Sequence, residues 1–197
     1  MYCALWLAAT ALGDVYFVSE PEESQDKPER DDESDPFSET PFDELSGRYP
    51  DERNLEEREV RVAGVYVHAD AATGVRGDFV LVRDNRGRCV LIWVGQFEAS
   101  AISMALQGLT GDRPLTHELL KNLAERLGGA IERVVIDDLW GETFYAKIWL
   151  RVNGKSLPVD SRPSDAIALA LRAEAPLYMT EAVLEEASRP CEDLEGG

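Results

Sequence analysis

The sequence has few of the residues that build metal and redox centres. Its 197 residues include two histidines and three cysteines, Cys3, Cys89 and Cys191. The cysteines stand far apart and form no C-x-x-C pair, which argues against a zinc or redox motif. Two histidines are too few for a histidine-rich metal site. We therefore expect reduced cysteines in an intracellular, cytoplasmic protein.

The apolar N-terminal stretch lacks the features of a signal peptide or membrane anchor. Residues 1–18 are largely apolar, but no Lys or Arg precedes the run and Asp14 interrupts it. The run is also short for a membrane span. We expect no membrane anchor, and three interpretations of the segment stay open: a docked strand, a loose tail or an over-extended start.

Positive charge is scarce as well. The chain has 20 Lys and Arg against 38 Asp and Glu, for a net charge of −18. Residues 19–59 carry −12 and residues 181–197 carry −5, whereas residues 60–180 are neutral. A protein that grips duplex nucleic acid through many phosphates gathers basic residues on its folded part. Tight, non-specific duplex binding is therefore not expected, and weak contact with a single strand stays open.

The acidic flanks predict the domain limits. Residues 19–59 combine dense negative charge with prolines and few large apolar side chains, a composition that buries too little surface to fold. We predict a disordered acidic leader there, with an acidic decoy for a basic partner as the alternative. An acidic tail is predicted over residues 188–197, which leaves residues 60–187 as the folded domain.

Hydrophobic periodicity predicts two groups of three strands, each followed by a helix. The first strands are expected over residues 60–69, 78–84 and 88–94, and the second over residues 130–140, 142–152 and 155–160. Helices are expected over residues 98–107, 116–127 and 163–172. The middle helix has Thr116 as its expected N-cap and ends at Gly128-Gly129.

The two groups resemble each other in order and composition. Residues 87–107 align with residues 154–172 when the strand-to-helix loop is shortened by two residues. We interpret this as an internally duplicated unit of three strands and a helix. The predicted fold class is α+β, with a mixed, mainly antiparallel sheet or a barrel-like core and packed helices.

Duplication would bring the two strand-to-helix loops to comparable positions, and both carry carboxylates. Glu98 lies in the first loop, and Asp160 and Asp165 lie in the second. Hard cations such as Mg²⁺ or Mn²⁺ take oxygen ligands and keep waters that can attack phosphorus. Glu98, Asp160 and Asp165 are therefore candidate metal ligands. The alternative for Glu98 and Asp165 is a favourable position in the first turn of a helix.

Three further residues are candidates for phosphate chemistry. His117 lies in the first turn of a predicted helix and could act as a general base or, when charged, hold a phosphate. The alternative is an exposed or capping histidine. Arg162 and Ser164 flank the start of the last predicted helix and are candidate phosphate-binding residues. Their alternatives are an ion pair with Asp160 for Arg162 and helix capping for Ser164.

The strand over residues 142–152 alternates strictly, so that one face carries aromatic and cationic side chains. These are Tyr145, Lys147, Trp149 and Arg151. Such a face suits stacking on the bases and neutralising the phosphates of single-stranded RNA or DNA. An oligomer interface is the alternative, because interfaces also favour Tyr, Trp and Arg.

These segments resemble the bifunctional nuclease domain over about residues 60–187. The resemblance rests on IWVGQFEASAISMALQG, RPLTHELLKNLAERLGG, ERVVIDDLWGETFYAKIWLRVNG and VDSRPSDAIALALRAEAPLYMTEAVLEEA. It implies a compact α+β domain, a homo-oligomer, and the nuclease activity on RNA and DNA ascribed to plant relatives. The matching positions are Glu98, His117, Asp160, Arg162, Ser164 and Asp165. The predicted function is hydrolysis of phosphodiester bonds, with a non-catalytic homo-oligomeric interaction or regulatory domain as the alternative.

Overall fold

The computed structural model describes residues 54–69 and 76–193. The segment over residues 1–18 and all but the end of the predicted leader lie outside this range. The first predicted strand group is confirmed as β1 (Glu57–Ala69), β2 (Arg76–Asp84) and β3 (Arg88–Val94). Strand β1 begins at Glu57 rather than Val60, because its first residues pair with a strand from the end of the domain.

The predicted helices and the second strand group are also present. In chain order they are α1 (Gln96–Leu106), α2 (Thr116–Arg126), β4 (Gly129–Trp140), β5 (Thr143–Val152), β6 (Lys155–Ser161) and α3 (Pro163–Ala173). Helix α2 has Leu115 rather than Thr116 as its N-cap, and the Glu118 carboxylate accepts the Leu115 backbone N–H at 3.0 Å. No helix among the described residues is long and apolar enough to cross a membrane.

Four short elements follow α3 that periodicity did not predict. They are β7 (Leu177–Thr180), α4 (Glu181–Ala187), β8 (Arg189–Pro190) and a 3₁₀ turn, η2 (Cys191–Asp193). A strand of four residues and a helix of seven are too short to show a hydrophobic period clearly.

All eight strands form one mixed sheet in the order β6-β5-β4-β7-β1-β2-β3-β8. Strand β7 pairs in parallel with β4 and antiparallel with β1, so the two three-stranded groups flank it on either side. The α+β class and the repeated order of elements are confirmed. The sheet is open, with β6 and β8 at its edges, so the barrel-like form is not the one observed.

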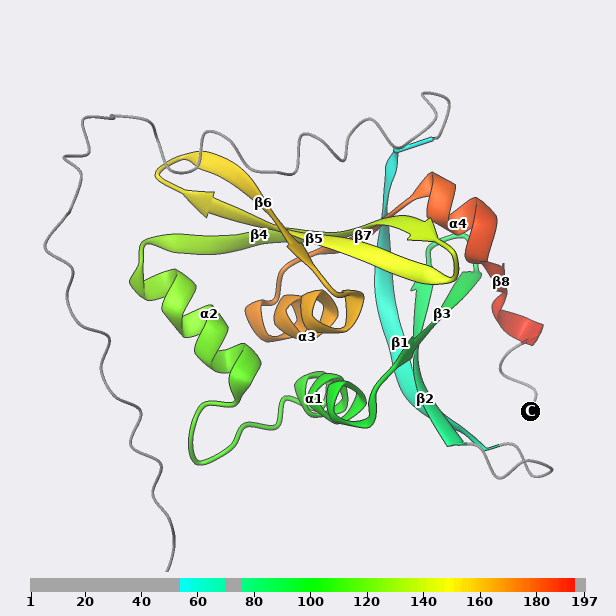
Figure 1. The fold of residues 1–197 in the computed structure, drawn as a ribbon, viewed down its shortest axis with the longest axis horizontal. Coiled ribbons are helices and arrows are strands. Elements are labelled where there is room, and N and C mark those ends of the chain that lie inside the picture. The colour runs from blue at the N-terminus through cyan, green and yellow to red at the C-terminus, as the bar shows by residue number, and fades with distance from the viewer. Residues whose placement is uncertain (1–53, 70–75, 194–197) are drawn as a thin grey trace, which may run out of the picture. The chain divides into compact units, whose positions relative to one another are not determined.

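Helices α1 and α3 fill the angle between the two halves of the sheet, with α2 beside α3 (Figure 1). The core combines valines and isoleucines of β2, β3, β4 and β5 with Ile102 of α1. Helix α3 is buried at every position from Ala166 to Ala170, as expected for a helix that is apolar nearly all round. The helix that follows the second loop is therefore fixed in the centre of the domain.

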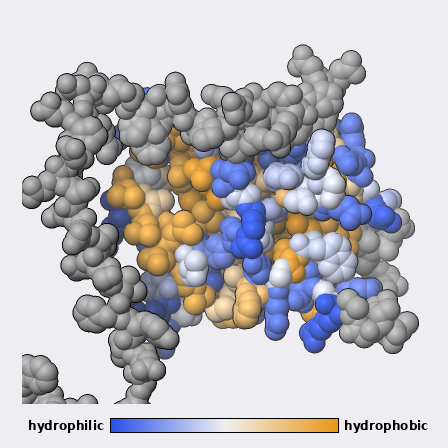
Figure 2. All heavy atoms as spheres, in the orientation of Figure 1, coloured by the Kyte–Doolittle hydropathy of each residue, from blue (hydrophilic) through white to orange (hydrophobic). Residues whose placement is uncertain are grey.

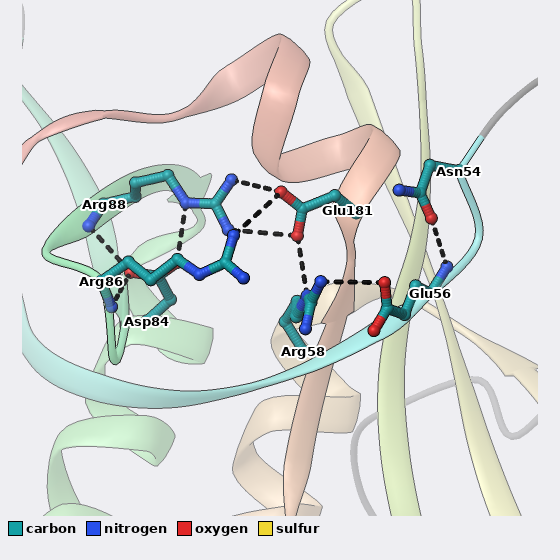
Figure 3. Close-up of polar contacts among 7 residues, drawn as sticks. All are labelled: Asn54, Glu56, Arg58, Asp84, Arg86, Arg88 and Glu181. Carbon is teal, nitrogen blue, oxygen red and sulfur yellow. Dashed lines mark hydrogen bonds and ion pairs between the residues drawn. The ribbon is translucent and has the colours of Figure 1, made fainter.

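An ion cluster holds α4 against the first half of the sheet (Figure 3). Arg88 Nη1 donates to Glu181 Oε1 at 2.7 Å, and Arg58 Nε donates to Glu181 Oε2 at 2.9 Å. Arg88 Nε also donates to Asp84 Oδ2 at 2.7 Å. Both carboxylates are buried, at 6% exposure each. The hydrogen bond from Arg88 lowers the pKa of Glu181 to about 2; burial opposes this shift and Arg58 reinforces it.

The expectation of reduced cysteines is corrected by the structure. Cys89 at the start of β3 and Cys191 of η2 form a disulfide across a sequence separation of 102 residues. Both cysteines are buried with Leu81, and Leu91 packs against them. Wide spacing in the sequence gave no sign of the pair, because the fold returns the C-terminal segment to the edge of the sheet beside β3.

We predict that the Glu181 cluster makes stability depend on pH. A carboxylate whose pKa is lowered by folding stabilises the native state above its unfolded pKa of 4.5, and this stabilisation is lost as the pH falls toward about 2. Glu181→Gln should lower the free energy of unfolding at pH 7 by about 3 kcal/mol, as when one partner of a buried pair is removed. The difference from the parent protein should shrink between pH 4.5 and 2.

Denaturant titrations of both proteins across this pH range measure the effect. Glu185→Gln is the matched control, because Glu185 is exposed on the same helix. A Glu181→Gln variant whose stability follows the parent curve at every pH would contradict the assignment.

Candidate functional site

The two strand-to-helix loops meet, as the duplication predicts. Arg162, the N-cap of α3, donates from Nη1 to Glu98 Oε1 of α1 at 3.0 Å. Its Nε donates to Asp165 Oδ2 at 2.8 Å, and its Nη2 donates to Asp165 Oδ1 at 3.2 Å. Residues separated by more than sixty positions in the sequence therefore share one guanidinium group.

His117 joins the same group from α2. Its Nε2 lies 3.3 Å from Asp165 Oδ1. The first turn of α2 is held in place by Arg172 at the end of α3, which contacts Glu118 Oε1 at 2.9 Å and donates to the Leu109 carbonyl at 2.6 Å. Helix α3 thus positions the histidine through one contact at each of its ends. We call Glu98, His117, Arg162 and Asp165 the site cluster.

The charges of the site cluster support one another. Burial raises the pKa of Asp165, but hydrogen bonds and charge from Arg162 and His117 outweigh it, so the pKa lies below its ordinary value. The same contacts with Asp165 and Glu98 raise the pKa of Arg162. The carboxylate of Asp165 and the guanidinium of Arg162 therefore both stay ionised near neutral pH.

A cleft of about 330 Å³ meets the site cluster at Glu98 and Arg162, whereas His117 and Asp165 are not among the residues that line it. It is lined by the end of β3, the β4–β5 turn and the start of α3, and its polar residues include Glu98, Arg162 and the buried Ser164. Glu142 also lines the cleft and was not predicted as a site residue. Its φ of 69° places it in the left-handed region of the turn. The sequence signal that could have found it is the Trp140-Gly141-Glu142 turn.

Gly95, the N-cap of α1, makes room for the Glu98 carboxylate. A Cβ atom at this position would collide with Glu98 Oε2. The missing side chain lets the carboxylate fold back over the start of α1 while Oε1 accepts from Arg162. A glycine at this position is therefore needed to accommodate the Glu98 side chain of the site cluster.

Asp160 is not part of the site cluster. It is exposed on β6, in register with Lys147 of β5, and the contacts of the cluster do not include it. Among residues 54–69 and 76–193, no three His, Cys, Asp or Glu side chains are grouped as a metal site would need. The Arg162 guanidinium lies between the two remaining carboxylates, so they do not fit a cation in this arrangement. Metal binding by Glu98, Asp160 and Asp165 stays a prediction from the sequence.

Side chains of the neighbouring strand β4 contact the aromatic and cationic face of β5. The Arg133 guanidinium lies over the Trp149 ring at 4.3 Å from its centroid. Lys147 Nζ lies 2.7 Å from Asp137 Oδ2, and Arg151 Nη2 lies 3.2 Å from a carboxylate oxygen of Glu132. Tyr145 is 40% exposed. The alternation that predicted this face is confirmed, while its binding to nucleic acid stays a prediction.

The site cluster combines a histidine–carboxylate pair with an arginine that keeps unused N–H donors. When Nε2 of His117 carries the proton and donates to Asp165, Nδ1 holds a lone pair that can accept a proton. Arginine has five N–H donors and Arg162 uses three of them in the contacts described above. Its side chain is 66% exposed, so the other two can reach a ligand oxygen in the cleft.

Comparison with known proteins matches this chain to one domain family. A family model described as the bifunctional nuclease domain matches residues 80–192, which include the whole site cluster. An uncharacterized protein of Mycobacterium tuberculosis is 42% identical over 130 residues, which cover 66% of this chain and 75% of the relative.

Plant proteins are more distant relatives. Bifunctional nuclease 1 of Oryza sativa subsp. japonica is 25% identical over 109 residues, which cover 53% of this chain and 33% of the plant protein. Bifunctional nuclease 2 of Arabidopsis thaliana is 25% identical over 103 residues, which cover 51% of this chain and 31% of the relative. The similarity to the plant proteins therefore extends over about a third of their length.

We predict that Arg162→Ala raises the pKa of Asp165, because the variant loses two hydrogen bonds and the nearest positive charge. Carbon-detected NMR of the Asp carboxyl groups across an acid titration measures the change. Arg151→Ala is the control, since Arg151 is an exposed, ion-paired arginine at the far end of β5. An Asp165 titration that is the same in Arg162→Ala and the parent protein would show that the bidentate contact does not form in solution.

Proposed function

The chain belongs to the bifunctional nuclease domain family, and from this membership we propose that it hydrolyses phosphodiester bonds of RNA or DNA. The observation that carries the proposal is the site cluster: a histidine paired with a carboxylate beside an exposed arginine at the edge of a cleft. The names of the plant relatives support the same class of reaction.

His117 is the proposed general base. Hydrolysis of a phosphodiester needs a group that removes a proton from the attacking water. In the tautomer with the proton on Nε2, His117 donates a hydrogen bond to Asp165 Oδ1, and Nδ1 is left unprotonated as the proposed base. The carboxylate also stabilises the imidazolium that forms when the ring takes up the proton. As water oxygen bonds to phosphorus, the bond from phosphorus to the leaving nucleoside oxygen breaks, and that oxygen takes a proton from solvent. The roles are the same whether the substrate is RNA or DNA.

Arg162 is the proposed phosphate-binding residue. Its bidentate contact with Asp165 and its third contact with Glu98 hold the guanidinium plane in one orientation. The two remaining N–H donors can then bind phosphate oxygens without further ordering of the side chain. Ser164, at the second position of α3, adds a hydroxyl and a backbone N–H that precedes the first hydrogen bond of the helix.

We predict that His117→Asn lowers the rate of cleavage by about 100-fold or more, the usual contribution of a general base. Arg162→Ala should lower it as well, because the phosphate loses its fixed donors. The full chain is assayed on fluorescent single-stranded RNA and DNA, with Mg²⁺, with Mn²⁺ and with EDTA. Loss of cleavage in EDTA and recovery with Mn²⁺ would support the metal requirement predicted from the sequence.

Asn122→Ala is the matched control, because Asn122 is exposed on α2 one turn from the site cluster. Circular dichroism and thermal unfolding verify that each variant is folded. Cleavage by His117→Asn at the parent rate would reject the proposed base.

The apolar face of α2 favours a second role, self-association. The more buried positions of α2 are His117, Glu118, Lys121 and Ala124, so the helix packs on the domain through polar and small residues. Its leucines point away: Leu115 is 36% exposed, Leu119 50%, Leu120 51%, Leu123 51% and Leu127 82%. Figure 2 shows hydrophobic surface on the side of the molecule where Figure 1 places α2. A contiguous patch of this kind is typical of a protein interface, and a second copy of the chain is the proposed partner.

We predict that Leu119→Glu combined with Leu123→Glu converts an oligomer to monomers, because two carboxylates would be buried in the interface. Light scattering coupled to size-exclusion chromatography gives the mass. Trp140→Glu, at an exposed apolar position on β4, should leave the mass unchanged. A parent protein that is monomeric at all concentrations tested would reject self-association through this face.

A further inference from the structure

Four rings form a continuous row across the first three strands. Tyr66 of β1 lies opposite Phe79 of β2, which in turn lies opposite Trp93 of β3. The centroids of Tyr66 and Phe79 are 5.6 Å apart, those of Phe79 and Trp93 are 5.4 Å apart, and those of His68 and Trp93 are 6.0 Å apart. Tyr66 is 45% exposed and Trp93 59%. We call these four residues the aromatic row.

Two glycines provide the space in which the rings lie. A Cβ atom at Gly77 would approach the Trp93 ring to 2.8 Å, and one at Gly64 would approach the Tyr66 ring to 2.9 Å. The indole and the phenol therefore lie against backbone on one side. The Tyr66 and Trp93 rings are therefore restrained on one side and exposed on the other. A ligand can bind the exposed side at low cost in conformational entropy.

Trp93 joins the aromatic row to the candidate active site. Trp93 is one of the residues that line the cleft, together with Glu98 and Arg162. It also lines a second hollow of about 350 Å³ together with Leu91, Ala187 and Arg189. The aromatic row therefore meets the cleft at Trp93, and the arginine of the site cluster borders the same cleft.

The charges near the row differ from those on β5. Arg189 is exposed at the second hollow and has no ion-pair partner among the residues that the structure describes. The cations of β5, by contrast, are held by carboxylates of β4. Rings combined with an available arginine are the features that single-stranded nucleic acid needs, because every base has a face that can stack and every linkage carries a negative charge.

We propose that the aromatic row is the binding surface for a single-stranded nucleic acid, whose bases stack on Tyr66, Phe79 and Trp93 while its backbone enters the cleft at Arg162. The proposal rests on the proposed nuclease function for the identity of the ligand. It explains why the surface is continuous with the cleft, which a protein partner would not require. A duplex fits this surface poorly, because its bases are already stacked on one another.

The test measures binding separately from cleavage. Fluorescence anisotropy reports binding of a labelled twelve-residue oligothymidylate to the full chain, in the His117→Asn background so that the oligonucleotide stays intact. A sugar–phosphate strand of the same length without bases serves as the second probe. The variants are Tyr66→Ala, whose site lies at the end of the row away from the cleft, and Trp140→Ala, an exposed tryptophan outside the row.

Stacking predicts that the oligothymidylate binds at least about tenfold more tightly than the strand without bases. Tyr66→Ala should weaken oligothymidylate binding by about tenfold and leave the strand without bases unchanged, and Trp140→Ala should change neither. Equal affinity for the two probes would overturn the proposal. A Tyr66→Ala variant that binds the oligothymidylate normally but has a lower mass in light scattering would assign the row to contact between protein chains instead.

Failure of the binding proposal and failure of the catalytic proposal give different results. If His117→Asn cleaves at the parent rate, the assignment of the base fails, and binding is then measured with a nuclease-resistant phosphorothioate strand. If cleavage follows the proposal but the two probes bind alike, the aromatic row fails and the site cluster stands.

Discussion

Strand β7 is the constraint on which the arrangement of the two halves depends. It pairs with β4 on one side and β1 on the other, and so makes one sheet from two three-stranded groups. Helices α1 and α3 then share the space between the groups, and their N-terminal ends face each other. The contact of Arg162 with Glu98 follows from this pairing. Four residues of strand thus decide where the two loops of the duplicated unit meet.

The Glu181 cluster and the site cluster, both built from arginine and carboxylate groups, lie in different environments. The Glu181 cluster is buried, so removal of one partner leaves charges without compensation inside the domain. Arg162 is largely exposed, and exposed ion pairs contribute little to stability. The ion pairs of Arg162 therefore add little to the stability of the fold. Their main effect is to fix the orientation of the guanidinium group. The first cluster therefore stabilises the fold, and the second is the one for which we propose phosphate binding.

The aromatic face of β5 and the aromatic row differ in how their side chains are paired. On β5, alternation correctly placed tyrosine, lysine, tryptophan and arginine on one face, but β4 supplies Asp137, Glu132 and Arg133 as partners for three of them. On β1, β2 and β3, the rings come from three separate strands and no single segment shows them as a set. The face of β5 could be predicted because its residues lie in one segment. The aromatic row could not, because strand register brings its residues together.

The sequence by itself determined the α+β class, the duplicated order of elements and the helix start at Pro163, and it singled out the residues of the site cluster as candidates. These follow from local periods, turn residues and the repetition of one pattern, which need no knowledge of distant contacts. Only the tertiary structure decided that Arg162 lies between Glu98 and Asp165, that Asp160 stands apart, and that Cys89 pairs with Cys191. It also turned the leucines of α2 outward, where periodicity alone suggests a core-facing stripe. The physical reason is that sheet register and helix packing depend on residues far apart in the chain, and local patterns carry no information about which of them meet.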